Sequence, residues 1–178
     1  MKKIMFNDKY CLTLSVLNGT KTMTRRVLRD NIPLGNWEET IKHLPYKVGE
    51  VVAIAQSYRE VYPNADFEMV GNGFITESAG WNNKMFVKAD LMKFHIKITN
   101  VKIERLQDIS EEDCLREGVW QFYDNKKLFY VSKNIGYAPD VAFLTAREAF
   151  WYLIDKVSGK GTWESNPFVV AYSFKLID

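Results

Sequence analysis

The stretch Gly19-Thr20-Lys21-Thr22-Met23-Thr24-Arg25-Arg26 separates a helical pattern from an extended one. Before it, apolar side chains recur at helical spacing, which predicts a helix that Asp8 caps and Gly19 ends. After it, residues 22–28 are rich in β-branched side chains and indicate extended backbone. The stretch therefore predicts a helix, a glycine turn and a strand in succession.

The same eight residues concentrate one amine, three hydroxyls and two guanidiniums. A lysine three residues before a threonine can form an amine-activated hydroxyl nucleophile. The mixture of hydroxyls and guanidiniums can equally form a loop that grips an anion. From the residues alone, both interpretations stay open.

The rest of the chain mixes strand and helix patterns and predicts an α+β fold. Residues 93–103 alternate apolar and lysine side chains, and Thr99-Asn100 interrupts the alternation as a β-bulge would. Helices are predicted from Ser110 to about Glu117, ended by Gly118, and from Asp140 to about 157. Further extended segments are predicted at 3–6, 50–61, 67–70, 84–88, 126–132 and 168–176, with a loop and helical turn at 29–44.

The 178 residues and the absence of repeats or a linker predict one domain, with insertions near 63–83 and 120–139. A formal charge of +2 does not by itself indicate a nucleic-acid binder. The lysines at 84, 88, 93, 97 and 102 are typical of a solvated face, whereas the cationic cluster at 21–29 is typical of a ligand-facing patch. No signal peptide or apolar membrane span is evident, which predicts a cytoplasmic protein away from membranes. We also expect a monomer.

The cysteines and histidines give no metal-ligand spacing. Cys11 and Cys114 are far apart and lie in apolar helical patterns, so buried, reduced thiols are predicted. His43 and His95 are too few and too distant for a zinc site. We therefore expect no metal and no cofactor.

Four separated segments form a pattern along the chain. They contain Gly19, Lys21, Thr24 and Arg26, then Pro45-Tyr46-Lys47-Val48-Gly49-Glu50, then residues 104–113 with Glu117-Gly118, and finally Trp163-Glu164-Ser165-Asn166-Pro167. Together they resemble the ASCH domains, a branch of the PUA-like folds, and in particular their longer, phage-type members. The resemblance implies a PUA-like mixed-strand β-barrel with helices packed on its outside. It also implies that the chain binds RNA or a modified nucleoside.

Some small ASCH proteins remove the acetyl group from N4-acetylcytidine. Carried over through this resemblance, their catalytic set becomes Lys21, Thr24 and Glu117. A lysine activates a hydroxyl only as the neutral amine, and burial or neighbouring cations such as Arg25 favour that form. Lys21 and Thr24 would face opposite sides of a regular strand, so the set requires Lys21 to lie in the turn after Gly19 or the strand to be bulged.

The remaining candidate residues are ligand-binding ones. Arg26 occupies the motif position and is predicted to contact a phosphate or a base edge, while Arg25 is interpreted as a surface charge. Gly19 belongs to the same ligand-binding turn. Trp163 can stack on a base and Asn166 can read a base edge, although a tryptophan that covers the end of a barrel is an equal alternative. The other four tryptophans, at 37, 81, 120 and 151, are interpreted as core or loop anchors.

Two departures from the resemblance keep other functions open. Where longer members carry an Arg-Glu pair, this chain has Ala55-Gln56, and its insertions could reshape the pocket. A ribonuclease and a non-catalytic adaptor that binds a protein therefore remain as alternatives. Turnover of acetylcytidine would indicate the hydrolase, and degradation of RNA would indicate the ribonuclease. Binding of a protein without turnover would indicate the adaptor.

Overall fold

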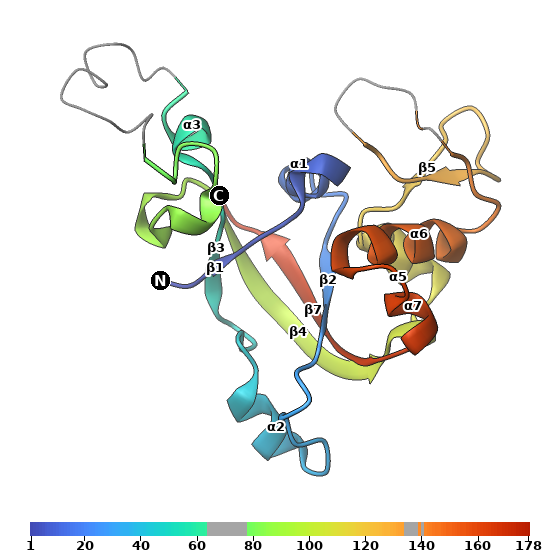
Figure 1. Cartoon of the computed structure of the whole chain (residues 1–178), viewed down its shortest axis with the longest axis horizontal. Coiled ribbons are helices and arrows are strands. Elements are labelled where there is room, and N and C mark those ends of the chain that lie inside the picture. The colour runs from blue at the N-terminus through green and yellow to red at the C-terminus, as the bar shows by residue number, and fades with distance from the viewer. Residues whose placement is uncertain (64–77, 134–138, 140) are drawn as a thin grey trace.

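The computed structural model describes residues 1–63, 78–133, 139 and 141–178, and its centre is a five-stranded sheet (Figure 1). The strands are β1 (Lys3–Ile4), β2 (Met23–Val27), β3 (Val51–Ile54), β4 (His95–Arg105) and β7 (Phe168–Leu176), in the order β1-β3-β4-β7-β2. Within this sheet of the described residues, β1 and β3 pair in parallel and the other neighbours are antiparallel. This arrangement leaves β2 at one edge of the sheet.

The closed barrel expected from the ASCH resemblance is wrong for the described residues. Barrel closure requires the two edge strands to pair, and here β1 and β2 stand at opposite edges of an open sheet. The edge strand β1 has only two residues, and the next elements along the chain are helices. The short strands β5 (Trp120–Gln121) and β6 (Phe129–Tyr130) form a separate two-stranded sheet. The fold is mixed α+β with an open sheet.

The long ladder between β4 and β7 forms the middle of the sheet. Its register shifts between Ile98 and Asn100, so the predicted β-bulge is confirmed. The bulge adds one residue to β4, and the buried face therefore passes from Ile96 and Ile98 to Val101 without loss of the alternation.

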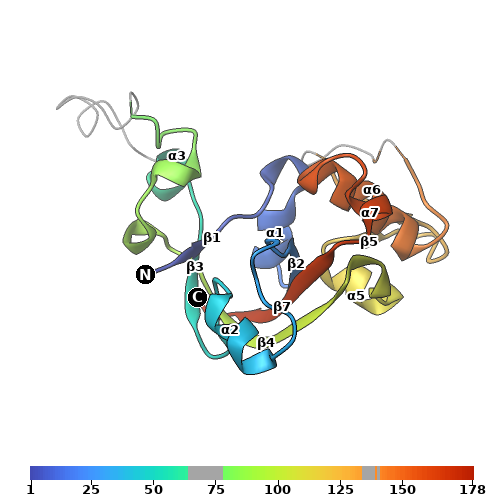
Figure 2. The ribbon, with the colours of Figure 1, turned by 60° about the horizontal axis from the view of Figure 1, so that its bottom comes forward.

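Helices lie close to β2, whose other side pairs with β7 (Figures 1 and 2). Near its start lie the 3₁₀ helix η1 (Asp8–Tyr10) and α1 (Leu12–Leu17); α5 (Glu111–Arg116), α6 (Ala146–Ser158) and α7 (Thr162–Ser165) gather at one end of the sheet. The remaining helices are α2 (Trp37–His43), α3 (Tyr58–Val61), and the 3₁₀ helices η2 (Lys84–Phe86), η3 (Ala89–Leu91) and η4 (Leu106–Asp108). Within the described parts of the chain, no helix is both long enough and apolar enough to cross a membrane.

Several predicted boundaries needed correction. The helix expected from Asp8 to Asn18 is divided because Cys11 adopts a left-handed conformation with φ of 54°. The long helix begins at Ala146, because Thr145 accepts a hydrogen bond from the Glu148 backbone and the two residues form a capping box. The segment at 84–88 forms η2 instead of a strand. The strand expected at 67–70 and most of the first insertion lie outside the described residues, as does part of the second.

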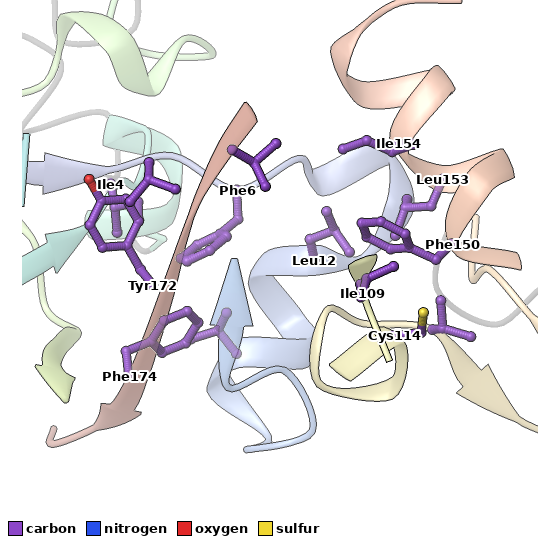
Figure 3. Packing of buried hydrophobic residues seen from close by; sticks show 14 of the residues in the cluster. Ile4, Phe6, Leu12, Ile109, Cys114, Phe150, Leu153, Ile154, Tyr172 and Phe174 are labelled. Atoms are coloured by element: carbon purple, nitrogen blue, oxygen red, sulfur yellow. The ribbon is translucent and has the colours of Figure 1, made fainter. Parts of the chain in front are cut away.

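The main hydrophobic core lies between the sheet and α1, α5 and α6 (Figure 3). Phe150 and Leu153 project from α6 toward Leu12 of α1, and Cys114 of α5 joins them, as Figure 3 shows. Both cysteines are buried and free, as predicted. Trp151, interpreted as a core residue, is instead 42% exposed, because it lies on the outer face of α6.

Candidate functional site

The turn before β2 places Lys21 inside the protein. Gly19 has a φ of +78°, a conformation that favours glycine, and the chain reverses there after α1. The Lys21 backbone N–H donates to Ser15 O at 2.8 Å, and β2 begins only at Met23. Lys21 therefore lies in the turn, which is the position that the Lys21 and Thr24 pairing requires.

The Lys21 ammonium group is 2% exposed and has three hydrogen-bond acceptors. Nζ donates to Met23 O at 2.8 Å, to Glu117 O at 2.6 Å and to Glu117 Oε2 at 2.9 Å. Burial lowers the pKa of Lys21 below its usual range, while the Glu117 carboxylate opposes this effect. The group is thus satisfied as an ammonium, yet its surroundings favour the neutral amine more than water does.

Glu117 reaches the site because α5 ends beside the Lys21 turn. It is the C-cap of α5, and Gly118 follows it with a φ of +103°. The Thr22 N–H donates to Arg116 O at 3.0 Å, which ties the end of α5 to the start of β2. With an exposure of 4%, Glu117 is buried and its carboxylate lies between two cations, Lys21 on Oε2 and Arg25 on Oε1.

Arg25, interpreted from the sequence as a surface charge, is a buried ion-pairing residue. Its guanidinium donates to Glu104 Oε1 at 2.6 and 2.9 Å, to Asp113 Oδ2 at 2.9 Å and to Glu117 Oε1 at 3.1 Å. Lys102 and Arg116 add outer ion pairs to the same carboxylates. We call Lys21, Arg25, Lys102, Glu104, Asp113, Arg116 and Glu117 the ion network. Burial of so much charge is tolerated because each member has an opposite charge in contact.

The expected solvated lysine face is also only partly present. Lys84 is buried, and its Nζ donates to Phe6 O at 2.6 Å and to Asp8 Oδ2 at 2.7 Å. Lys102 stays exposed, as predicted, although it pairs with carboxylates of the ion network. The carbonyl and the carboxylate from a distant segment account for the burial of Lys84.

A cavity of about 240 Å³ lies against this network, and we call it the Lys21 pocket. Its polar lining includes Lys21, Thr24, Arg25, Arg26 and Glu117. Its apolar lining comes from α1, α6 and the segment after β1: Met5, Phe6, Leu12, Phe150, Leu153, Ile154 and Val157. The structure thus brings the three predicted catalytic residues to one cavity.

Thr24 and Arg26 are the residues of the motif that keep donors free for a ligand. Thr24 Oγ1 has no hydrogen bond to another described residue, although Thr24 is only 5% exposed. Arg26 is exposed and donates through one nitrogen to the Met5 carbonyl, which leaves most of its five N–H groups unused. Arg25 and Arg26 both line the pocket, although the side chains of adjacent residues in a strand point to opposite faces.

The other predicted ligand-binding residues lie elsewhere. Trp163 is 8% exposed and packs in the core with its ring 6.3 Å from that of Trp151, and it does not line the Lys21 pocket. Asn166 is the C-cap of α7, and its Oδ1 accepts the Gln107 N–H at 2.9 Å. Gly19 shapes the turn without lining the pocket. The side chains of Trp163 and Asn166 fulfil structural roles. For Trp163, the alternative of a residue that covers the core therefore fits better than base stacking.

Sequence reasoning missed Glu104 and Asp113, which hold Arg25 from the other side. Weak signals were present, because Glu104 follows Lys102 at the spacing of one strand face and Asp113 precedes Arg116 by three helical positions. Neither spacing identifies Arg25 as the shared partner.

Comparisons with protein-family models, with curated proteins and with solved structures found no match to this chain.

Proposed function

We propose that the Lys21 pocket binds the base of an acylated cytidine and that the protein hydrolyses the acyl amide. The observation that carries the proposal is the shared cavity: the Lys21 amine, the Thr24 hydroxyl and the Glu117 carboxylate all line it. The resemblance of the Gly19–Arg26 motif to ASCH domains supports the same chemistry. The proposal depends on the pocket and does not require a barrel.

The size and lining of the pocket suit a base rather than a whole cofactor. Its volume of about 240 Å³ is below the roughly 300–1,000 Å³ typical of drug-sized ligands. Phe6 and Phe150 provide apolar surface for a flat ring, and Arg26 supplies donors at the wall. An acylated base fits these features, with its sugar outside the cavity.

The reaction that we infer begins with the ion pair. The Lys21 proton passes to Glu117 Oε2 along their 2.9 Å hydrogen bond, which leaves a neutral amine in a buried site. That amine takes the Thr24 proton as Oγ1 attacks the acyl carbonyl, and an acyl-threonine ester forms. The exocyclic nitrogen leaves with a proton from the pair. Water then hydrolyses the ester, so that one amide and one water give the free amine and the carboxylic acid.

The test measures the conversion of N4-acetylcytidine to cytidine by chromatography. Thr24→Val should lower kcat by at least about 100-fold, since it removes the nucleophile while it keeps the volume. Thr99→Val is the matched control, because Thr99 is an exposed hydroxyl residue of β4 that does not line the pocket. It should leave turnover close to that of the wild type. Absence of turnover in the wild type, or full activity of Thr24→Val, contradicts the hydrolase proposal.

One observation favours a second candidate, a binder without catalysis. All three Lys21 N–H groups are already donated, to two carbonyls and one carboxylate, as in a structural lysine. This candidate expects calorimetric binding of acetylcytidine without product formation. Lys21→Met should then weaken binding only as far as it disturbs the fold, which a thermal melt measures.

A further inference from the structure

We propose that a groove on the outer face of α6 binds an amphipathic carboxylate, an extended apolar chain with one anionic head group. The groove has a volume of about 600 Å³ and is lined by α6, by residues 142–144 before the helix and by Lys160 after it. We call it the α6 groove. It shares no lining residue with the Lys21 pocket, so this inference does not rest on the proposed function.

The α6 groove lies on the side of α6 that faces away from the hydrophobic core. Its lining residues on the helix are three and four positions apart and form one stripe: Glu148, Trp151, Tyr152, Asp155 and Lys156. Trp151 is exposed, and Leu144, which lines the groove ahead of the helix, is 74% exposed. Exposed apolar side chains that gather at one cavity mark a binding site. The stripe extends over about 12 Å of the helix axis, which is room for an extended chain.

The aromatic walls of the groove are held in place by contacts with the rest of the protein. The Trp151 ring stacks at 6.3 Å on the ring of the buried Trp163. The Tyr152 ring lies 5.5 Å from that of Phe143, and the Phe143 N–H donates to Phe129 O at 2.8 Å. A cavity whose walls are fixed before binding loses little conformational entropy when a ligand enters.

The unpaired charges of the groove are cationic. Neither Lys156 nor Lys160 forms an ion pair with a carboxylate of the described residues, and Lys156 Nζ lies 5.2 Å from the centre of the Tyr152 ring. The two acidic residues of the groove already accept backbone hydrogen bonds. Glu148 Oε2 accepts two at 3.2 Å, and the two oxygens of Asp155 accept one each, at 2.9 and 3.1 Å. The two ammonium groups therefore remain to bind a carboxylate.

The size of the groove favours a small ligand over a protein partner. Its volume of about 600 Å³ lies within the roughly 300–1,000 Å³ typical of small-molecule sites. Its nine lining residues are fewer than the roughly 20–30 residues that a stable protein interface uses on each side. In the complex that we infer, the apolar chain packs on Leu144 and the aromatic walls, and the head group contacts the two lysines.

The experiment is isothermal titration calorimetry of the whole chain at neutral pH. The probe is dodecanoate, and dodecyl maltoside is the uncharged ligand with the same chain, both below the concentration at which they form micelles. The test variant is Lys156→Gln with Lys160→Gln. Its control is Lys97→Gln with Lys175→Gln, which removes two exposed cations that face each other across β4 and β7.

A second variant tests the apolar part of the groove. Leu144→Ser is compared with Leu34→Ser, because both leucines are exposed and Leu34 does not line the groove. Substitution of exposed side chains leaves the core intact, and a thermal melt of each variant verifies folding. Sedimentation of the wild type, with and without dodecanoate, detects a second copy of the chain on the same face.

We expect wild-type protein to bind dodecanoate at least about fivefold more tightly than dodecyl maltoside, and the lysine variant to lose that difference, because the two cations contact the head group. The lysine control should match the wild type. Leu144→Ser should weaken the binding of both ligands by at least about threefold, and Leu34→Ser should weaken neither.

Three outcomes overturn the proposal. The first is absence of dodecanoate binding to the wild type, and the second is equal affinity of the wild type and the lysine variant for dodecanoate. The third is a dimer that Leu144→Ser abolishes and dodecanoate does not affect, which assigns the groove to a second copy of the chain. None of these measurements depends on turnover of acetylcytidine, so failure of the hydrolase proposal leaves them interpretable.

Discussion

Arg25 is a buried cation that three carboxylates of the site share. It is 4% exposed and contacts three carboxylates, Glu104, Asp113 and Glu117, which come from β4 and α5. A buried carboxylate is costly without a partner, whereas a fully paired network is tolerated. Arg25 therefore supports the site by holding Glu117 in place, while Thr24 and Arg26 keep free donors toward the cavity.

Arg25→Met should lower the free energy of unfolding by about 3–5 kcal/mol, because it removes the shared cation from two buried carboxylates, Asp113 and Glu117, and from the half-buried Glu104. Denaturant unfolding at neutral pH measures the loss. Arg29→Met is the control: Arg29 is exposed and outside the ion network, so its change should stay within about 0.5 kcal/mol. Equal effects of the two substitutions would mean that the network does not stabilise the fold.

Cys114 should be inert in the native protein. It is fully buried in the core, and burial raises the pKa of its thiol to about 12. Because the thiolate is the reactive form, alkylation at pH 8 should label Cys114 only after the protein unfolds. Peptide mass mapping with and without denaturant measures this. Rapid labelling of the native protein at Cys114 would show that the α5–α6 contact opens readily.

At the scale of elements, the site depends on where α5 ends. Ser110 caps the start of the helix by accepting from the Asp113 N–H, and Gly118 ends it in a left-handed conformation. A side chain at 118 would bring its Cβ to 2.9 Å from Leu12 Cδ2 and 3.5 Å from Lys21 Cδ. The glycine thus permits both the backbone turn and the close approach of α1 and Lys21 to the end of α5.

Gly118→Ala should destabilise the protein by more than about 1 kcal/mol, because alanine strains a positive φ and meets Leu12. It should also weaken ligand binding in the Lys21 pocket through displacement of Glu117. Gly35→Ala is the matched control, since a Cβ there meets nothing within 4 Å and its φ is not in the left-handed region. Thermal melts of both variants test this, and equal melting temperatures would contradict the argument.

At the scale of the whole molecule, the ion network joins segments that do not pair directly in the sheet. It links β2 to β4 and α5 through residues 79 to 96 positions apart. From α5 the contacts continue to α6, where Ala146 N donates to Glu111 Oε2 at 2.9 Å and Arg147 donates to Ile109 O at 2.7 Å. Loss of charge in the network should therefore affect the stability of the whole described fold.

Acid should remove part of this stability through Asp113. Burial raises its pKa, but hydrogen bonds and charge from Arg25 and Lys102 outweigh burial and lower the pKa below the usual 3.8. A carboxylate with a lowered folded-state pKa stabilises above its unfolded pKa and loses that contribution as pH falls through the folded value. The stability difference between wild type and Asp113→Asn should therefore be largest near neutral pH and shrink below pH 3.8.

Urea unfolding from pH 7 downward measures this difference. Asp90→Asn is the control, because the Asp90 side chain is 77% exposed and its partner is the chain's own N-terminus. Its effect should be small at every pH. A wild-type advantage over Asp113→Asn that persists unchanged well below pH 3.8 would contradict the assignment.

The sequence by itself determined the local features: the glycine turn that places Lys21 before β2, the bulge at Ile98 and Asn100, and the Ser110 cap. Each depends on backbone conformation and on neighbours within one or two turns, which spacing and residue type report directly. The resemblance to ASCH domains also selected Lys21, Thr24 and Glu117, which line one cavity. Their catalytic roles stay predictions.

The tertiary structure alone decided which arginine is buried, that the sheet is open, and that Trp163 is a core residue. These outcomes depend on desolvation and on partners far away in the chain, such as Glu104 for Arg25 across 79 positions. Arg25 and Arg26 look alike in sequence, and only the carboxylates that fold against one of them distinguish the two. Burial of charge is a property of the assembled surroundings, and no local pattern encodes it.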